Sequence, residues 1–93
     1  MSYATRIEAK LREALAPTHL SIKDVSHRHA GHAGARPEGE THFNVEIVSQ
    51  HFEGLNRVAR QRLVYDLLRE EMEERVHALA LRTLTPAEAA SDA

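Results

Sequence analysis

Apolar residues near the start of the chain recur every three or four positions, which places them on one side of a helix. The stripe consists of Tyr3, Ile7, Leu11, Ala14 and Leu15. This spacing predicts an amphipathic helix over 3–15. Ser2 is a suitable N-cap because its hydroxyl can accept a backbone N–H of the first turn. Pro17 ends the helix because it lacks a backbone N–H.

Two later segments alternate between apolar and polar residues, which is typical of strands with one buried face. The first is 19–26, HLSIKDVS, and the second is 41–49, THFNVEIVS. In the second strand Phe43, Val45 and Ile47 share one side, and His42, Asn44 and Glu46 share the other. The segment 27–40 between them contains three glycines and one proline. It is therefore predicted to be a flexible loop that joins the strands in an open hairpin.

The helical spacing returns between Leu55 and Met72, and predicts one long helix with Asn56 as its N-cap. Its arginines are Arg57, Arg60, Arg62 and Arg69, and its last turns carry Glu70, Glu71, Glu73 and Glu74. This order opposes the helix dipole, which favours acidic residues at the start and basic residues at the end. Helix stability alone does not explain the arginines, so they are available to an anionic partner.

A third strand is predicted over 76–84, VHALALRTL, with His77, Leu79 and Leu81 on one side. Thr85, Pro86 and Glu88 then form the pattern of a capping box, which begins a short helix. Residues 89–93 are expected to fray.

The predicted order is therefore α-β-β-α-β-α, and the fold class is α+β. A long helix between the second and third strands permits a crossover that makes these two strands parallel. We expect a small three-stranded mixed sheet with helices packed on one face.

The chain has 93 residues, a formal net charge of −2 at pH 7 and no cysteine. This length predicts one domain over 1–93. The charge argues against a surface that binds a phosphate backbone throughout, but allows a local basic patch. We find no apolar run long enough to span a membrane, about 18 residues, and no secretory signal. These features predict a cytoplasmic protein without a membrane partner.

Four of the seven histidines, His27, His29, His32 and His42, lie between residues 26 and 43. Neutral imidazole is the commonest metal-binding side chain. The spacing is not that of a four-ligand zinc site. Two interpretations stay open for this loop, a metal site for an ion such as Zn²⁺ or Ni²⁺ and a solvated loop that is rich in histidine. Taken alone, His42 and His77 are interpreted as structural groups of their strands.

The arginine-bearing helix also has two interpretations. Arginine side chains bind phosphates and guanine edges, so this segment could be a basic recognition helix for DNA. The alternative is a solvated helix face. For enzymatic chemistry we find neither a cysteine nucleophile nor a glycine-rich phosphate loop between a strand and a helix. The sequence therefore predicts a binding protein rather than an enzyme.

Three segments together resemble the BolA family: GETHFNVEIVS, FEGLNRVARQRLVYDLL and VHALALRTLTPAE. The resemblance extends from about residue 3 to residue 88. In addition, SHRHAGH resembles the branch of the family that carries histidine in its loop. The resemblance implies a fold similar to class II KH domains, with a helix-turn-helix-like element.

The resemblance also implies a function. BolA-like proteins pair with monothiol glutaredoxins and share a 2Fe-2S cluster with them and with glutathione, in iron–sulfur trafficking or in iron and redox sensing. In this chain the implied ligands are His77 and one loop histidine. His29 matches the family pattern, His32 is the alternative to it and His27 is the third choice.

Family members also act as transcriptional regulators, so Arg57, Arg60 and Arg62 are implied to contact DNA or a partner protein. The free chain is expected to be a monomer or a weak homodimer. A bacterial protein of this kind would be cytoplasmic, and a eukaryotic one would lie in the mitochondrial matrix.

Overall fold

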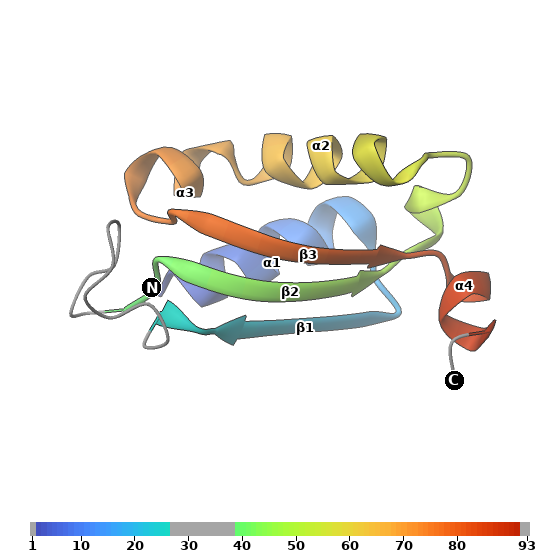
Figure 1. Ribbon diagram of the computed structural model, residues 1–93, viewed down its shortest axis with the longest axis horizontal. Coiled ribbons are helices and arrows are strands. Elements are labelled where there is room, and N and C mark those ends of the chain that lie inside the picture. Colours follow the sequence, from blue (N-terminus) through green and yellow to red (C-terminus); the bar gives the residue numbers. More distant parts are fainter. Residues whose placement is uncertain (1, 27–38, 92–93) are drawn as a thin grey trace.

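The computed structural model describes residues 2–26 and 39–91 (Figure 1). Its elements are the helix α1 (Tyr3–Leu15), the strands β1 (His19–Asp24) and β2 (His42–Val48), the 3-10 helix η2 (Gln50–Phe52), the helices α2 (Arg57–Leu67) and α3 (Arg69–Glu74), the strand β3 (Ala78–Leu84) and the helix α4 (Pro86–Ser91). The structure confirms the predicted α+β class. The comparison with KH domains and the helix-turn-helix-like element stay predictions.

The three strands form one sheet in the order β1-β2-β3, with β2 in the centre. β1 and β2 are antiparallel, whereas β2 and β3 are parallel. The register places Ile22 opposite Val45, and Val45 opposite Leu81. The predicted mixed sheet, its hairpin and its parallel pair are therefore confirmed.

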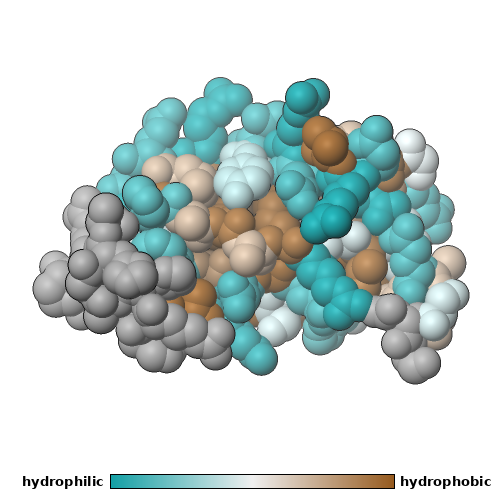
Figure 2. Space-filling model, viewed as in Figure 1, coloured by the Kyte–Doolittle hydropathy of each residue, from teal (hydrophilic) through white to brown (hydrophobic). Residues whose placement is uncertain are grey.

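The core lies between one face of this sheet and the helices. In Figure 1, α1 lies behind the strands, and α2 and α3 extend beside the β3 edge. The buried apolar residues of the core are Ile7, Leu11, Leu15, Phe43, Val45, Ile47, Phe52, Val64, Leu68, Val76 and Leu79. On the opposite face Ala78 and Ala80 are exposed. Figure 2 shows apolar surface in the middle of that face, bordered by hydrophilic residues.

The predicted helix caps are present. Ser2 Oγ accepts the N–H of Thr5, and Asn56 Oδ1 accepts the N–H of Ala59. Thr85 and Glu88 form the reciprocal capping box at the start of α4. α4 continues to Ser91, so it includes the first part of the segment that was expected to fray. We find no helix among residues 2–26 and 39–91 that is long and apolar enough to span a membrane.

The prediction of one long helix after Asn56 is wrong, because the helix ends at Leu67 and α3 begins at Arg69. Leu68 between them has φ −104° and ψ 17°, and its side chain is fully buried. Glu70 and Glu71 therefore lie in the first turn of α3. Acidic residues are stabilising at that position, because the positive end of the helix dipole lies at the N-terminus. The break therefore makes the positions of Glu70 and Glu71 favourable, whereas α2 still has no acidic residue in its first turn and α3 still has no basic residue in its last turn.

The placement of His77 inside the third strand is also wrong. β3 begins at Ala78, and His77 lies before it. Val76 is 2% exposed and belongs to the core, whereas His77 is exposed, so His77 does not share the buried side of Leu79. The consecutive N–H groups of His77 and Ala78 both donate to the carbonyl oxygen of Thr41. The alternation of exposed and buried side chains in β3 therefore begins at Ala78, after the two N–H groups that share the Thr41 carbonyl oxygen.

Candidate functional site

Two histidines meet where β2 and β3 begin. The ring centroids of His42 and His77 are 5.4 Å apart, and the ring planes are tilted by 47°. His42 is 8% exposed, whereas His77 is exposed. Among the described residues we find no hydrogen bond or ion pair to the imidazole of His77. The pair therefore joins an anchored imidazole to one that faces solvent.

Thr41 is fully buried and contacts both histidines. Its carbonyl oxygen accepts the backbone N–H of His77 at 2.6 Å and that of Ala78 at 3.1 Å. Its Oγ1 lies 2.8 Å from His42 Nδ1. One residue thus fixes the backbone of His77 and the ring of His42.

Ser26 ties the end of β1 to the same place. Its hydroxyl oxygen accepts the N–H of Thr41 at 2.9 Å and that of His42 at 3.1 Å. The Ser26 hydroxyl itself donates to a carboxylate oxygen of Asp24. The carbonyl oxygen of His42 accepts the N–H of Val25 at 2.9 Å. These hydrogen bonds hold the residues that follow β1 next to His42.

The chain also re-enters the described structure at this pair, through Gly39 and Glu40. Arg75 donates from Nε and Nη2 to the carbonyl oxygen of Gly39, at 3.1 and 2.7 Å. The Glu40 N–H donates to Asp24 Oδ2 at 3.0 Å. Glu40 Oε1 accepts the N–H of Tyr3 at 2.7 Å, at the start of α1. Gly39 and Glu40, which were predicted as part of a flexible loop, are therefore anchored.

The loop histidines His27, His29 and His32 lie outside the described residues. The two anchored ends of their segment, Ser26 and Gly39, lie beside the histidine pair. Within residues 2–26 and 39–91, no group of three or more histidine, aspartate or glutamate side chains could hold a metal ion. A complete metal centre would need ligands from outside that part of the chain.

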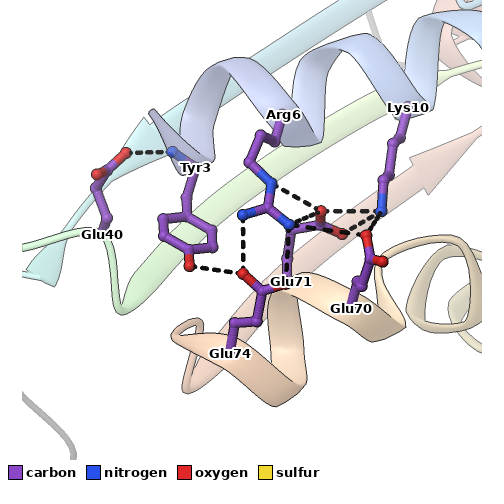
Figure 3. A network of polar contacts seen from close by, with 7 residues as sticks. All are labelled: Tyr3, Arg6, Lys10, Glu40, Glu70, Glu71 and Glu74. Atoms are coloured by element: carbon purple, nitrogen blue, oxygen red, sulfur yellow. Dashed lines mark hydrogen bonds and ion pairs between the residues drawn. The ribbon is translucent and has the colours of Figure 1, made fainter. Parts of the chain in front are cut away.

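An ionic network holds the turn that carries His77 (Figure 3). The Glu71 carboxylate is fully buried and receives Arg6 and Lys10 from α1, each at 2.9 Å. Glu74 receives Arg6 at 2.9 Å, and the hydroxyl of Tyr3 donates to it. The bond from Arg6 is the main reason why the pKa of Glu74 lies below its ordinary value. α3 is thus fixed to α1, one residue before the segment 75–77.

This network could not be predicted from the sequence, because its partners lie about 65 residues apart along the chain and a glutamate in a helix is usually exposed to solvent. The only signal was the run of acidic residues with basic residues on the first helix.

The three predicted arginines do not form one surface. Arg57 and Arg62 are exposed, and a helical step of about 100° per residue places them roughly 140° apart around α2. The side chain of Arg60 is 11% exposed. Its guanidinium donates to the carbonyl oxygen of Thr83 at 3.1 Å and to Glu88 at 2.7 Å. Arg60 therefore holds α2 to β3 and α4.

The Arg60–Glu88 pair also has an electrostatic effect. The hydrogen bond from Arg60, followed by the backbone bond from Thr85, lowers the pKa of Glu88 to about 2. The ion pair is therefore formed at neutral pH. It engages Arg60, which was predicted from the sequence to contact DNA or a partner protein.

Comparison with known proteins places these features in a family. The model of the family described as "BolA-like protein" matches residues 11–88. The chain is 54% identical over 90 residues to the chloroplastic protein BOLA1 of Arabidopsis thaliana, covering 95% of this chain and 56% of that protein. It is 45% identical over 85 residues to the DNA-binding transcriptional regulator BolA of Escherichia coli, covering 91% of this chain and 77% of that protein.

The solved structures agree. The BolA domain of SufE1 from Arabidopsis thaliana superposes with a TM-score of 0.86 at 48% identity, over 95% of this chain and 96% of that domain. The chain spans about half the length of the chloroplastic BOLA1, and 24% of the SufE-like protein 1 from the same plant. The relatives thus include a bacterial protein and proteins named for the chloroplast and the mitochondrion. The family match over most of the chain, together with the shared fold, shows that this chain belongs to the BolA family.

Proposed function

We propose that this chain is a non-enzymatic partner of a monothiol glutaredoxin, and that the two proteins share a 2Fe-2S cluster with glutathione. The observation that carries the proposal is the exposed His77, held beside His42 at the base of a histidine-rich segment. In this complex His77 is one ligand. A loop histidine is the other, His29 by the family pattern with His32 as its alternative.

The donor set of the chain fits a shared cluster rather than one that the chain holds alone. Protein 2Fe-2S clusters are held by thiolates, and histidine can replace cysteine at one of the two irons. This chain has seven histidines and no cysteine. It offers imidazole ligands for one iron, and the thiolates have to come from a cysteine of the glutaredoxin and from glutathione. Cluster trafficking, or sensing of iron and redox state, is the role that such a half-site supports.

Anaerobic reconstitution with a monothiol glutaredoxin, glutathione, iron and sulfide tests the proposal. Visible absorption and circular dichroism are compared for the wild type, His77→Ala, His29→Ala, His32→Ala and the control His19→Ala. His19 is exposed and pairs with Glu46 on the open face of the sheet, so its loss leaves the half-site intact.

The expected result is a heterocomplex spectrum that differs from that of the glutaredoxin homodimer and is lost in His77→Ala. The His29→Ala and His32→Ala spectra then identify the loop ligand. If no complex forms, or if the His77→Ala and wild-type spectra coincide, the proposal is wrong.

A second candidate function is DNA binding. It is favoured by the name of the relative from Escherichia coli and by the exposed Arg57 and Arg62. Binding of a duplex should weaken with salt, with a log–log slope of about −0.9 for each phosphate that the protein neutralises. Arg57→Ala and Arg62→Ala should each make this slope less negative by about one phosphate. Arg60→Ala should mainly lower stability, since Arg60 is held by Glu88.

A cytoplasmic location in a bacterium, or the mitochondrial matrix of a eukaryote, belongs to the same proposal. Fractionation with an antibody against the chain tests it. Recovery from a membrane or extracellular fraction would contradict it.

A further inference from the structure

The two edge strands of the sheet, β1 and β3, differ in how their outward backbone groups are bonded. On β3 the carbonyl oxygen of Leu79 accepts the Tyr65 hydroxyl at 3.0 Å. The carbonyl oxygen of Thr83 accepts Arg60 at 3.1 Å. Both donors come from α2, so this helix covers the β3 edge with side chains. An edge that is covered in this way is protected from pairing with another strand.

The outer edge of β1 has no such cover within the part of the chain that the structure describes. Val25 donates its N–H to the carbonyl oxygen of His42, so Val25 and every second residue before it face β2. Leu20 and Ile22 therefore direct their N–H and C=O groups away from the sheet, and among the described residues we find no hydrogen bond to them. In Figure 1, β1 is the strand farthest from α2 and α3.

We propose that the β1 edges of two copies of this chain pair antiparallel about a two-fold axis at Ile22, so that two three-stranded sheets become one continuous sheet. Ile22 of each copy then exchanges both backbone hydrogen bonds with Ile22 of the other. The Ile22 side chain is only partly buried, and its counterpart covers the exposed part. This inference does not rest on the glutaredoxin proposal, because the β1 edge contains none of the cluster ligands proposed above.

Lys23 selects this register. A lysine on an edge strand normally opposes pairing with another strand. Hydrogen-bonded pairs form only between residues that face outward, so the register can shift only in steps that keep these residues opposite each other. The two neighbouring registers place Lys23 opposite Lys23 or opposite His19 of the other copy. Like charges directly opposite each other are destabilising. The register centred on Ile22 instead places Lys23 opposite Ser21.

The same register gives Lys23 a counter-ion, which favours a second copy over an unrelated strand. Ser21 lies opposite Glu46, and Glu46 lies opposite Arg82, in one row across the open face. Lys23 of the second copy extends this row beyond Ser21. Two strand spacings, about 9.6 Å, separate its backbone from that of Glu46, and extended side chains span this distance over the small serine. Within the described residues Lys23 has no ion pair of its own.

The pairing should be weak. One strand of six residues from each copy buries less area than a standard stable interface, about 1,600 Å². We therefore expect a dissociation constant of about 0.1–1 mM. The chain should be monomeric in dilute solution and self-associate when it is concentrated.

Disulfide trapping tests the register, because the chain has no cysteine of its own. Ser21→Cys and Lys23→Cys chains, one of them labelled with ¹⁵N, are mixed in a glutathione redox buffer, and the products are identified by mass. Opposite residues of a non-hydrogen-bonded pair have Cα atoms about 4.5 Å apart, which suits a disulfide. Diagonal neighbours, about 7–8 Å apart, are too distant. The mixed disulfide should therefore exceed each homodimer by roughly fivefold or more, above the statistical factor of two.

Sedimentation of chains without cysteine tests the pairing itself. The wild type should follow a monomer–dimer equilibrium, and Lys23→Glu should weaken it by roughly tenfold, since it places a second carboxylate near Glu46. Arg62→Glu is the control, because it changes the net charge equally on the exposed side of α2. A wild type that stays monomeric at about 1 mM, the upper limit expected for such a contact, would overturn the proposal. A mixed disulfide at only the statistical ratio, or equal weakening in the two variants, would overturn it as well.

Discussion

The backbone N–H of His77 donates to the carbonyl oxygen of Thr41 across 2.6 Å, and this bond ties the turn before β3 to the residue that precedes β2. The side chain of the same threonine contacts the ring of His42. An exposed histidine in a turn would otherwise sample many positions. Here its backbone and the neighbouring imidazole are both fixed by one buried residue, so Thr41 controls the geometry of the pair.

Thr41→Val tests this control, because valine keeps the shape of threonine and removes only the hydroxyl. The variant loses the contact with His42 Nδ1, and its unfolding free energy in urea should fall by about 1 kcal/mol. Thr41→Ser is the control, since it keeps the hydroxyl. Equal unfolding free energies for the two variants would show that the hydroxyl contact with His42 does not stabilise the fold.

Gly39 is predicted to be more sensitive to substitution than Gly54, although both have positive φ, +77° and +81°. Alanine in this conformation costs about 1 kcal/mol or more at either site. A Cβ at Gly39 would also lie 3.1 Å from Asp24 Oδ2, the oxygen that accepts the N–H of Glu40, whereas nothing lies within 4 Å at Gly54. Gly39→Ala should therefore lose about 1 kcal/mol more than Gly54→Ala in urea unfolding. Equal losses would mean that the contact with Asp24 relaxes freely.

Glu71→Gln should destabilise the protein through the network in Figure 3. The neutral side chain leaves Arg6 and Lys10 facing a buried amide, and breaking a buried pair costs about 3–5 kcal/mol. Because both cations are partly exposed, we expect a loss at or just below the lower limit of this range, about 2–3 kcal/mol. Glu70→Gln is the matched control: Glu70 contacts Lys10 at 3.1 Å but is 67% exposed, so its loss should stay below about 1 kcal/mol. Similar urea midpoints for the two variants would contradict a stabilising role for Glu71.

Most helices and strands of the fold could be predicted from the sequence, because they depend on interactions between neighbouring residues. The two-residue alternation of β2 and the caps Ser2, Asn56 and Thr85 are decided by neighbours within a few residues, and the structure has them in the predicted places. The same local rules failed at Leu68, where neither glycine nor proline marks the helix break. The contacts that hold α3 after this break are long-range, from Glu71 to the first helix.

The candidate site was predictable only in part, for the same reason. His77 could be identified from the resemblance to the BolA family, but its exposure depends on the contact with Thr41. Arg57 and Arg60 are both arginines of α2. Arg60 nevertheless forms an ion pair with Glu88, near the end of the chain. Periodicity cannot distinguish an arginine that binds a partner from one that holds two helices together.

The Arg60–Glu88 pair predicts a pH dependence of stability. The folded state lowers the pKa of Glu88 from 4.5 to about 2, chiefly through the hydrogen bond from Arg60. A carboxylate with a depressed pKa stabilises the folded state above its unfolded pKa, and this contribution is lost as the pH falls through the folded value. Wild-type stability should therefore decrease between about pH 4.5 and pH 2, in part through this group.

Glu88→Gln isolates that contribution, since glutamine can still serve in the capping box with Thr85. In urea unfolding at a series of pH values, the variant should be less stable than the wild type at pH 7 and should lose less stability on acidification. The two curves should converge near pH 2, although both still fall because Glu74 also has a lowered pKa. Glu53→Gln is the control, since Glu53 is exposed and has no ion pair within the described residues. Its curve should stay parallel to that of the wild type. If the Glu88→Gln curve is parallel as well, the ion pair with Arg60 does not contribute to the stability of the fold.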